Sequence, residues 1–323
     1  MPLSSNEQTN TTAEALVSTL KGAFHTPPGF RPAHARGILL SGNFTPSSAA
    51  KSLSSAHHFN APSTPVLVRF SNSTGLPQIP DNAADANPRG MATRFVLPDD
   101  SDGRRQHTDI VAHSTPFFPV RTGEQFLEML QAIGASSGPD TPQPSPIQTF
   151  LAQNPSAAAF VAAPKPAPAS FATEKFFGVN AIKLVAGDGG ATFVRYRITP
   201  DAGEAHLSDD EAQAKDPAFL HNDIQTRIID GPVSFTLSAQ IADDADPTDD
   251  ATVRWPEDRQ IVPLGSIVLD AVVDDNDEKQ RTTIFDPVPR VPGLEPSADP
   301  LLDMRASIYL ISGRQRRAAG PHH

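Results

Sequence analysis

Proline recurs along the whole chain, and no other feature restricts the possible folds as strongly. The sequence holds 33 prolines in 323 residues, scattered rather than gathered into one linker. Because proline fixes φ and lacks an amide hydrogen, it interrupts helices and central strands. The pattern predicts many short elements joined by loops, which favours a β architecture. We interpret residues 138–170, the stretch richest in Pro, Ala and Ser, as a long excursion inside one domain.

Alternation of apolar and polar residues predicts half-buried antiparallel strands in several short segments. The expected strands cover residues 65–70, 90–97, 191–198, 233–241 and 261–272, and helical periodicity appears in residues 13–23, 122–133 and 300–311. Several strands at this spacing are typical of a barrel or a sandwich. The sequence therefore predicts an α+β fold with an antiparallel β core.

The charge balance excludes some classes of partner. There are 26 Lys and Arg against 37 Asp and Glu, a net charge of −11. Nucleic-acid binding depends on clustered basic residues, so we expect no nucleic-acid partner. No apolar run approaches the roughly 20 residues that cross a bilayer, so we expect no membrane partner. The acidic blocks at 243–250 and 270–278 predict exposed turns.

The chain contains no cysteine, which removes disulfides, thiolate nucleophiles and thiolate-bound metals from consideration. Any metal must be held by His, Tyr or carboxylate groups. The first residues lack the basic start and apolar core of a secretory signal, so we expect an intracellular, cytoplasmic protein.

Two short segments carry candidate chemistry. His34 lies three residues after Arg31 and two before Arg36. Arg305 lies four residues before Tyr309, so both share one face of a helix. In isolation, the ordinary alternatives are a structural loop histidine and an arginine packed on an aromatic ring. The chain has only two tyrosines, which draws attention to the second pair.

The combination of motifs along the chain is more specific than either segment. Five segments occur in this order: Arg-Pro-Ala-His-Ala-Arg-Gly at 31–37, Val-Arg-Phe-Ser at 68–71, Asn-Pro-Arg-Gly-Met-Ala at 87–92, His-Ser-Thr-Pro-Phe-Phe at 113–118, and Arg305-x-x-x-Tyr309. The sequence resembles the haem catalases, and specifically their short branch, the catalase-related peroxidases. The resemblance runs from about Ala13 to Ala318. It implies a catalase-like antiparallel β-barrel core with surrounding helices, and a single haem-binding domain over residues 1–323.

The resemblance assigns residues to the haem. Tyr309 matches the proximal iron ligand, and Arg305 supplies positive charge that favours the phenolate form. Arg31, Arg69 and Arg316 match the arginines that pair with haem propionates, where a forked guanidinium suits a carboxylate. Without the family, each would be interpreted as a solvated surface charge. In the same way, Phe126 matches the aromatic that stacks on the porphyrin, and its ordinary alternative is helix core.

The resemblance also assigns the distal side. His34 matches the histidine that accepts a proton from peroxide and returns it to the departing oxygen. Ser71 occupies the position that orients this histidine. Where catalases have Val-Gly-Asn-Asn-Thr-Pro, this chain has Val-Ala-His-Ser-Thr-Pro at 111–116, so His113 stands at the distal asparagine. This difference predicts weak catalase turnover.

We therefore expect a haem peroxidase that reduces hydrogen peroxide or organic hydroperoxides with small organic electron donors, as a monomer or small homo-oligomer. One alternative is a haem isomerase or dehydratase of fatty-acid hydroperoxides, similar to allene oxide synthase, which would consume no reductant. Another is a haem-binding or lipid-binding barrel without catalysis. The joint presence of His34 and Tyr309 favours catalysis, because a passive binder needs no distal acid-base group.

Overall fold

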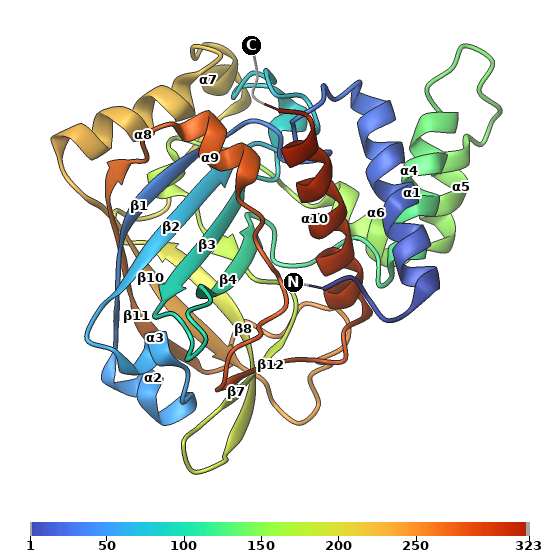
Figure 1. Ribbon diagram of the computed structural model, residues 1–323. Coiled ribbons are helices and arrows are strands. Elements are labelled where there is room, and N and C mark those ends of the chain that lie inside the picture. Colours follow the sequence, from blue (N-terminus) through green and yellow to red (C-terminus); the bar gives the residue numbers. More distant parts are fainter. Residues whose placement is uncertain (1, 321–323) are drawn as a thin grey trace.

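A β-barrel surrounded by helices forms the architecture, seen in a computed structural model that describes residues 2–320 (Figure 1). Met1 and residues 321–323, the ends of the expected 1–323 domain, lie outside this description. Within the described residues, eight strands close a ring in the order β10-β11-β1-β2-β3-β4-β6-β8, and β8 pairs again with β10. The expected α+β barrel fold is confirmed.

The strands pair antiparallel throughout. They are β1 Gly37–Pro46, β2 Thr64–Ser71, β3 Gly90–Leu97, β4 Gln106–His113, β5 Ala167–Pro168, β6 Phe176–Phe177, β7 Ile182–Val185, β8 Ala191–Pro200, β9 His206–Leu207, β10 Val233–Ile241, β11 Ile261–Val272 and β12 Leu294–Pro296. The α-helices are α1 Glu7–Phe24, α2 Ser48–Leu53, α3 His57–Asn60, α4 Gly123–Ala135, α5 Pro146–Gln153, α6 Pro155–Ala162, α7 Asp209–Gln213, α8 Phe219–Asp230, α9 Asn276–Thr282 and α10 Pro300–Ala318.

The register of β2, β3 and β4 creates one row of side chains. Ser71 pairs with Gly90, and Gly90 pairs with His113. Directly paired residues point to the same face of a sheet, and their neighbours in sequence point to the other. The neighbours Phe70 and Met91 are fully buried in the barrel core. The row Ser71–Gly90–His113 therefore lies on the face of the sheet away from that core.

The strand pairing around the barrel is shortest between β4 and β6. These strands share a single residue pair, His113 with Phe177. Beyond it, β8 pairs with β7 instead, and β12 extends that edge. The free edge of β4 is bound by a side chain, because Arg305 Nη2 donates to the Val111 carbonyl at 3.3 Å. A helix thus completes the wall at this place.

Helices α1, α4 and α10 pack beside one another on one side of the barrel (Figure 1). Helix α10 begins with Pro300 at its first turn, and the Asp299 side chain caps it by accepting from Leu301 N. Its buried positions recur at helical spacing, so one face meets the barrel and another meets α1. This packing brings the C-terminal helix against residues that precede β1.

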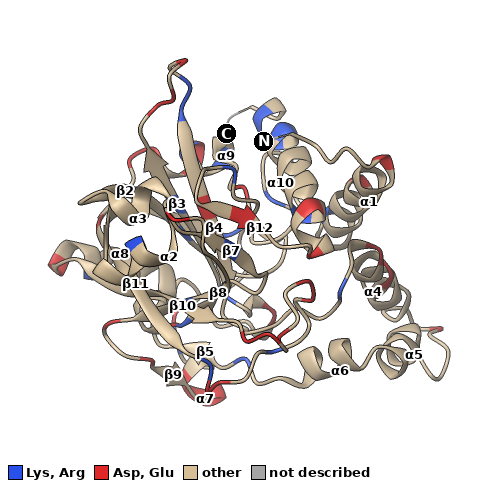
Figure 2. Cartoon of the chain, turned by 90° about the horizontal axis from the view of Figure 1, so that it is seen from below, with Lys and Arg blue, Asp and Glu red and all other residues tan. Residues whose placement is uncertain are grey.

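Two segments show how the sequence patterns relate to the structure. Residues 138–170, expected as a long excursion inside one domain, contain α5 and α6, whose first turns begin with proline. The turn expected over 270–278 is partly wrong, because β11 extends to Val272 and α9 begins at Asn276 with Gln280 buried. Acidic residues elsewhere do mark exposed elements, as in the first turn of α7 (Figure 2). Within residues 2–320, no helix is long and apolar enough to cross a bilayer.

Candidate functional site

His34 lies over the row of β-strand residues described above. Its Nδ1 atom is 3.1 Å from Ser71 Oγ. A Cβ atom on Gly90 would come within 2.8 Å of His34 Nδ1, so only glycine leaves room for the imidazole. The backbone of His34 has φ of 55°, a left-handed conformation that is unfavourable for a side-chain-bearing residue. The backbone at His34 is thus strained in the conformation that places this ring, and such strain is common at functional sites.

His113 stands on the same face, two strands from Ser71. Its Nδ1 is 2.6 Å from Thr115 Oγ1, and its Nε2 is buried without a partner among residues 2–320. The His113 ring lies 6.3 Å from Phe118, which lies 5.4 Å from Phe126 on α4. A buried nitrogen without a hydrogen bond is unfavourable. Its remaining hydrogen-bonding capacity is available to a bound molecule.

Both histidines are held neutral. Burial lowers the pKa of His34 to about 4, helped by the charges of Arg69, Arg31 and Arg305. Burial lowers the pKa of His113 to about 3, helped by Arg305 and His34. Yet both side chains keep some accessible surface. Each ring therefore keeps some surface that a bound molecule could contact.

Three arginines converge from separate elements. Arg31 precedes β1, Arg69 lies on β2 and Arg316 lies on α10. Arg31 Nη2 and Arg316 Nη2 donate to the same Thr283 carbonyl at 3.1 and 2.8 Å, and Arg69 Nε donates to Gln280 Oε1 at 2.7 Å. None of the three pairs with a carboxylate of the part of the chain that the structure describes. Buried charges without counterions mark a place for an anion.

The pKa values of these three arginines are lowered by their burial and by their positive charges. Burial and Arg69 hold the pKa of Arg31 well below its ordinary value. Burial and Arg316 lower the pKa of Arg69 to about 9, and burial and Arg31 lower that of Arg316 to about 8. The charge of Tyr309 opposes the lowered pKa in all three cases. An anionic phenolate at Tyr309, or a bound dicarboxylate, would relieve the repulsion.

Tyr309 and Arg305 share one face of α10, as their spacing predicted. The Arg305 guanidinium carbon lies 5.9 Å from the centre of the Tyr309 ring. Arg305 does not bind the Tyr309 oxygen; its N–H groups donate to Asn180 Oδ1 and the Val111 carbonyl. Asn180 Nδ2 in turn donates to Asp299 at 2.8 Å. Arg305 therefore lies over the Tyr309 ring and is fixed by its contacts with Asn180 and Val111.

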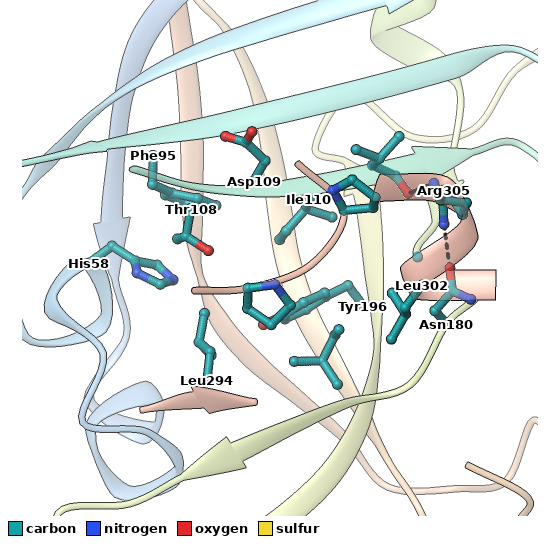
Figure 3. Close-up of a pocket in the computed structure, with 15 residues that line it drawn as sticks. His58, Phe95, Thr108, Asp109, Ile110, Asn180, Tyr196, Leu294, Leu302 and Arg305 are labelled. Carbon is teal, nitrogen blue, oxygen red and sulfur yellow. Dashed lines mark hydrogen bonds between the residues drawn. The ribbon is translucent and has the colours of Figure 1, made fainter. Parts of the chain in front are cut away.

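A small cavity of about 30 Å³ lies on the other side of Arg305 (Figure 3). Its lining includes His58, Thr108, Tyr196 and Leu294, with Arg305 and Asn180 at one end. A space of this size holds about two water molecules. It is separate from His34 and His113, which do not line it. The cavity therefore lies where β4 and β8 meet beside Arg305, and it is not part of the group around His34.

The expected residues are thus gathered into two groups. His34, Ser71 and His113 form the distal group, with Phe126 joined to it through Phe118. The proximal group contains Tyr309 with four arginines, and its members are Arg31, Arg69, Arg305 and Arg316. No sequence pattern indicated Gln280 or Thr283, which bind these arginines, because both act through contacts with residues distant in the chain.

These residues fit a haem. A haem enzyme that acts on peroxide needs an axial ligand such as Tyr for its iron, cations for its propionates and an acid-base group on the opposite side. Tyr309, the carboxylate-free arginines and His34 have the chemistry that these three functions would require. Neutral His34 and the unpartnered Nε2 of His113 fit the peroxide side. The fold and the site together define an oxidoreductase of the haem peroxidase class.

Comparison with known proteins agrees with this class. A family model described as Catalase matches residues 28–323, and the chain belongs to the catalase family. It is 35% identical over 308 residues to a catalase-related peroxidase of Mycolicibacterium paratuberculosis, covering 94% of this chain and 95% of the relative. It is 32% identical over 311 residues to a catalase-related peroxidase of Synechococcus elongatus, covering 95% and 89%.

Solved structures show the same fold. The crystal structure of a fungal catalase superposes with a TM-score of 0.78 at 24% identity, covering 93% of this chain and 62% of that one. Catalase A from Saccharomyces cerevisiae gives a TM-score of 0.78 at 24% identity, covering 93% and 64%. This chain therefore spans less than two thirds of those catalases, and the likeness concerns the barrel and its helices.

Proposed function

We propose that this protein is a haem peroxidase that reduces hydrogen peroxide or organic hydroperoxides with small organic electron donors. The observation that carries the proposal is the presence of two groups in one site. One is a neutral His34 that is hydrogen-bonded to Ser71, and the other is Tyr309 with nearby arginines that have no carboxylate partner. The haem, when bound, would supply the iron at which the O–O bond is cleaved and the capacity to store oxidising equivalents. We treat residues 1–323 as one haem-binding unit, in keeping with the packing of α1 on α10.

Tyr309 would hold the iron, and the arginines would hold the carboxylates. The Tyr309 oxygen accepts no hydrogen bond from residues 2–320, so its lone pairs are free for a metal. Arg31, Arg69 and Arg316 would exchange mutual repulsion for pairing with two propionates. A bidentate arginine–carboxylate pair is among the stronger polar contacts in proteins.

His34 would manage the protons. Its Nδ1 faces Ser71, so Nε2 is the nitrogen left for substrate. Nε2 could take a proton from one peroxide oxygen and deliver it to the other, which leaves as water or alcohol. Two electrons and two protons complete the reduction, and organic donors would supply them. His113, in place of the distal asparagine, would disfavour a second peroxide as that donor.

A spectroscopic and kinetic experiment tests this proposal. Purified protein loaded with haem should show a Soret band that changes on peroxide addition and recovers with a phenolic donor. His34→Ala should keep the haem but slow the peroxide step by roughly 10² to 10⁴-fold, the usual contribution of a general acid-base. The exposed His57→Ala is the matched control and should react like the unmodified protein.

Product analysis separates the alternatives. An isomerase or dehydratase would convert a fatty-acid hydroperoxide without consuming donor, and a passive barrel would show no spectral response to peroxide. Oxygen release from peroxide alone that exceeds donor oxidation would contradict the peroxidase assignment. The joint presence of His34 and Tyr309 favours the peroxidase over the passive barrel.

A further inference from the structure

A buried polar network lies behind the distal residues and is centred on Asp81. The Asp81 carboxylate is fully buried and accepts from Asn72 Nδ2 at 2.7 Å and from His221 Nδ1 at 2.9 Å. It also accepts from the backbone N–H groups of Leu220 and His221 at 2.8 and 3.2 Å. Asp81 thus caps α8, whose own N-cap residue makes no side-chain hydrogen bond.

The network reaches the strand that carries Ser71. Asn72 follows Ser71, and its backbone N–H donates to the Arg36 carbonyl at 3.1 Å. Its Oδ1 accepts from Arg89 Nη1 at 2.6 Å, while Arg89 Nη2 donates to the Asp81 carbonyl at 2.6 Å. The Asn72 side chain is therefore fixed from both ends. It is fully buried, so no water competes for these bonds.

The same network reaches the other distal strands. Arg89 precedes Gly90, over which His34 lies, and its backbone exchanges hydrogen bonds with Ser114 at 3.0 and 2.9 Å. Ser114 follows His113. The backbone of Asn72 also acts on the His34 ring, because it raises the pKa of that histidine. The segments that carry His34, Ser71 and His113 are thus joined through Asn72 and Arg89.

The charges make this network rigid. Burial disfavours the Asp81 carboxylate, but hydrogen bonds from His221 and Asn72 and the charge of Arg36 hold its pKa below the ordinary value. Arg36 Nη1 lies 3.7 Å from Asp81 Oδ1. A buried carboxylate stays ionised only if its donors stay in place, because an uncompensated buried charge is very unfavourable. The donors, and with them Asn72, therefore have one arrangement.

We propose that Asp81 is a positioning residue for His34, acting through the side chain of Asn72. This inference rests on the proposed function, because it concerns the proton transfer assigned to His34. Asp81 makes no hydrogen bond with His34; its side-chain partners are Asn72, His221 and the start of α8. It sets the place of Asn72 and Ser71, and these set the orientation of the imidazole. Misplacement of a catalytic group by about 1 Å can slow a reaction about 10²-fold.

The test uses haem-loaded protein and two reactions that need His34 as a base. In Asp81→Asn, an amide oxygen that still accepts from the start of α8 leaves the new NH2 group facing the Asn72 NH2 group. Two donors then face each other, and the hydrogen bond between residues 72 and 81 is lost. Stopped-flow measurements should show a fall of roughly tenfold or more in the peroxide rate constant and in the association rate of hydrogen cyanide.

A rescue variant distinguishes positioning from simple stabilisation. The exchange Asn72→Asp with Asp81→Asn restores an acceptor opposite a donor, so it should recover most of both rates. Asp246→Asn removes a buried carboxylate that binds Arg259 far from this network, and it should lower the melting temperature without changing either rate. If Asp81→Asn fails to retain haem, Asn72→Ala cuts the link while leaving α8 capped.

Two results would overturn the inference. One is an unchanged cyanide rate in both Asp81→Asn and Asn72→Ala. The other is an exchange variant that regains its melting temperature but not its rates. Cyanide association does not depend on peroxide turnover. A protein that binds cyanide through His34 but does not react with peroxide would therefore refute the proposed function and leave the role of Asp81 intact.

Discussion

The low pKa of His34 predicts an unusual pH dependence for the reaction with peroxide. The imidazole must be neutral to take a proton from peroxide, and burial lowers its pKa to about 4. We therefore expect the peroxide rate constant to be flat from neutral pH to about pH 5 and to fall tenfold per pH unit only below about pH 4.

The size of the effect follows from the two pKa values. At about pH 5, a histidine with a pKa of about 4 is about 90% neutral, whereas one with the ordinary value is about 3% neutral. Lowering the pKa from the ordinary 6.5 to about 4 makes protonation of His34 less favourable by about 3 kcal/mol. Arg69 and Arg31 contribute through charge, which haem carboxylates would offset, but burial is the largest cause and would remain.

Stopped-flow mixing with a pH jump measures this dependence before acid releases the haem. Arg69→Gln removes the largest charge contribution and should leave the midpoint the same or higher, never lower. Arg104→Gln, at an exposed arginine, is the control and should leave the midpoint unchanged. A midpoint near the ordinary histidine value in the unmodified protein would refute the argument that burial controls His34.

Three further predictions concern other residues. Tyr309→Phe removes the phenolic oxygen and should weaken or abolish haem binding; wild-type haem content with an unchanged spectrum would refute its role. His113→Asn should raise oxygen release relative to donor oxidation on an oxygen electrode, and an unchanged ratio would refute the control assigned to His113. His58 is packed against Phe59 and Phe95, and burial lowers its pKa to about 3. In the unfolded chain His58 takes up a proton near pH 6.5, whereas in the folded protein it stays neutral down to about pH 3. Its contribution to stability is therefore present above pH 6.5 and is lost as the pH falls toward about 3. In urea titrations, His58→Phe should reduce the difference in unfolding free energy between pH 7 and pH 4 by about 3 kcal/mol.

The sequence predicted those elements whose periodicity is local. Strands expected at 65–70, 90–97, 233–241 and 261–272 match β2, β3, β10 and β11 to within a residue. Strand β1 was not predicted, because its alternation is broken where the register shifts between Ser41 and Gly42. The β4 strand was recognised only as a motif around His113, because its charged residue Asp109 is buried and paired with Arg94 and the Asp286 backbone rather than exposed to water.

The site was accessible to sequence only through the family resemblance. The resemblance proposed His34 next to Ser71, and the structure places them 3.1 Å apart. It could not indicate the contact between Arg305 and Asn180, 125 residues apart, or that between Asp81 and His221, 140 residues apart. No local pattern marks such pairs, because each member alone is an ordinary polar residue. Only the closed barrel brings them together.

The distal and proximal groups come from opposite ends of the chain, since His34 and Tyr309 are separated by 275 residues (309 − 34). At about 5–20 residues per second, a ribosome needs roughly 15–55 s to synthesise the intervening segment. During that time the proposed iron ligand is absent. We therefore expect cofactor capture to follow translation of α10, and a nascent chain halted before Tyr309 to carry no haem.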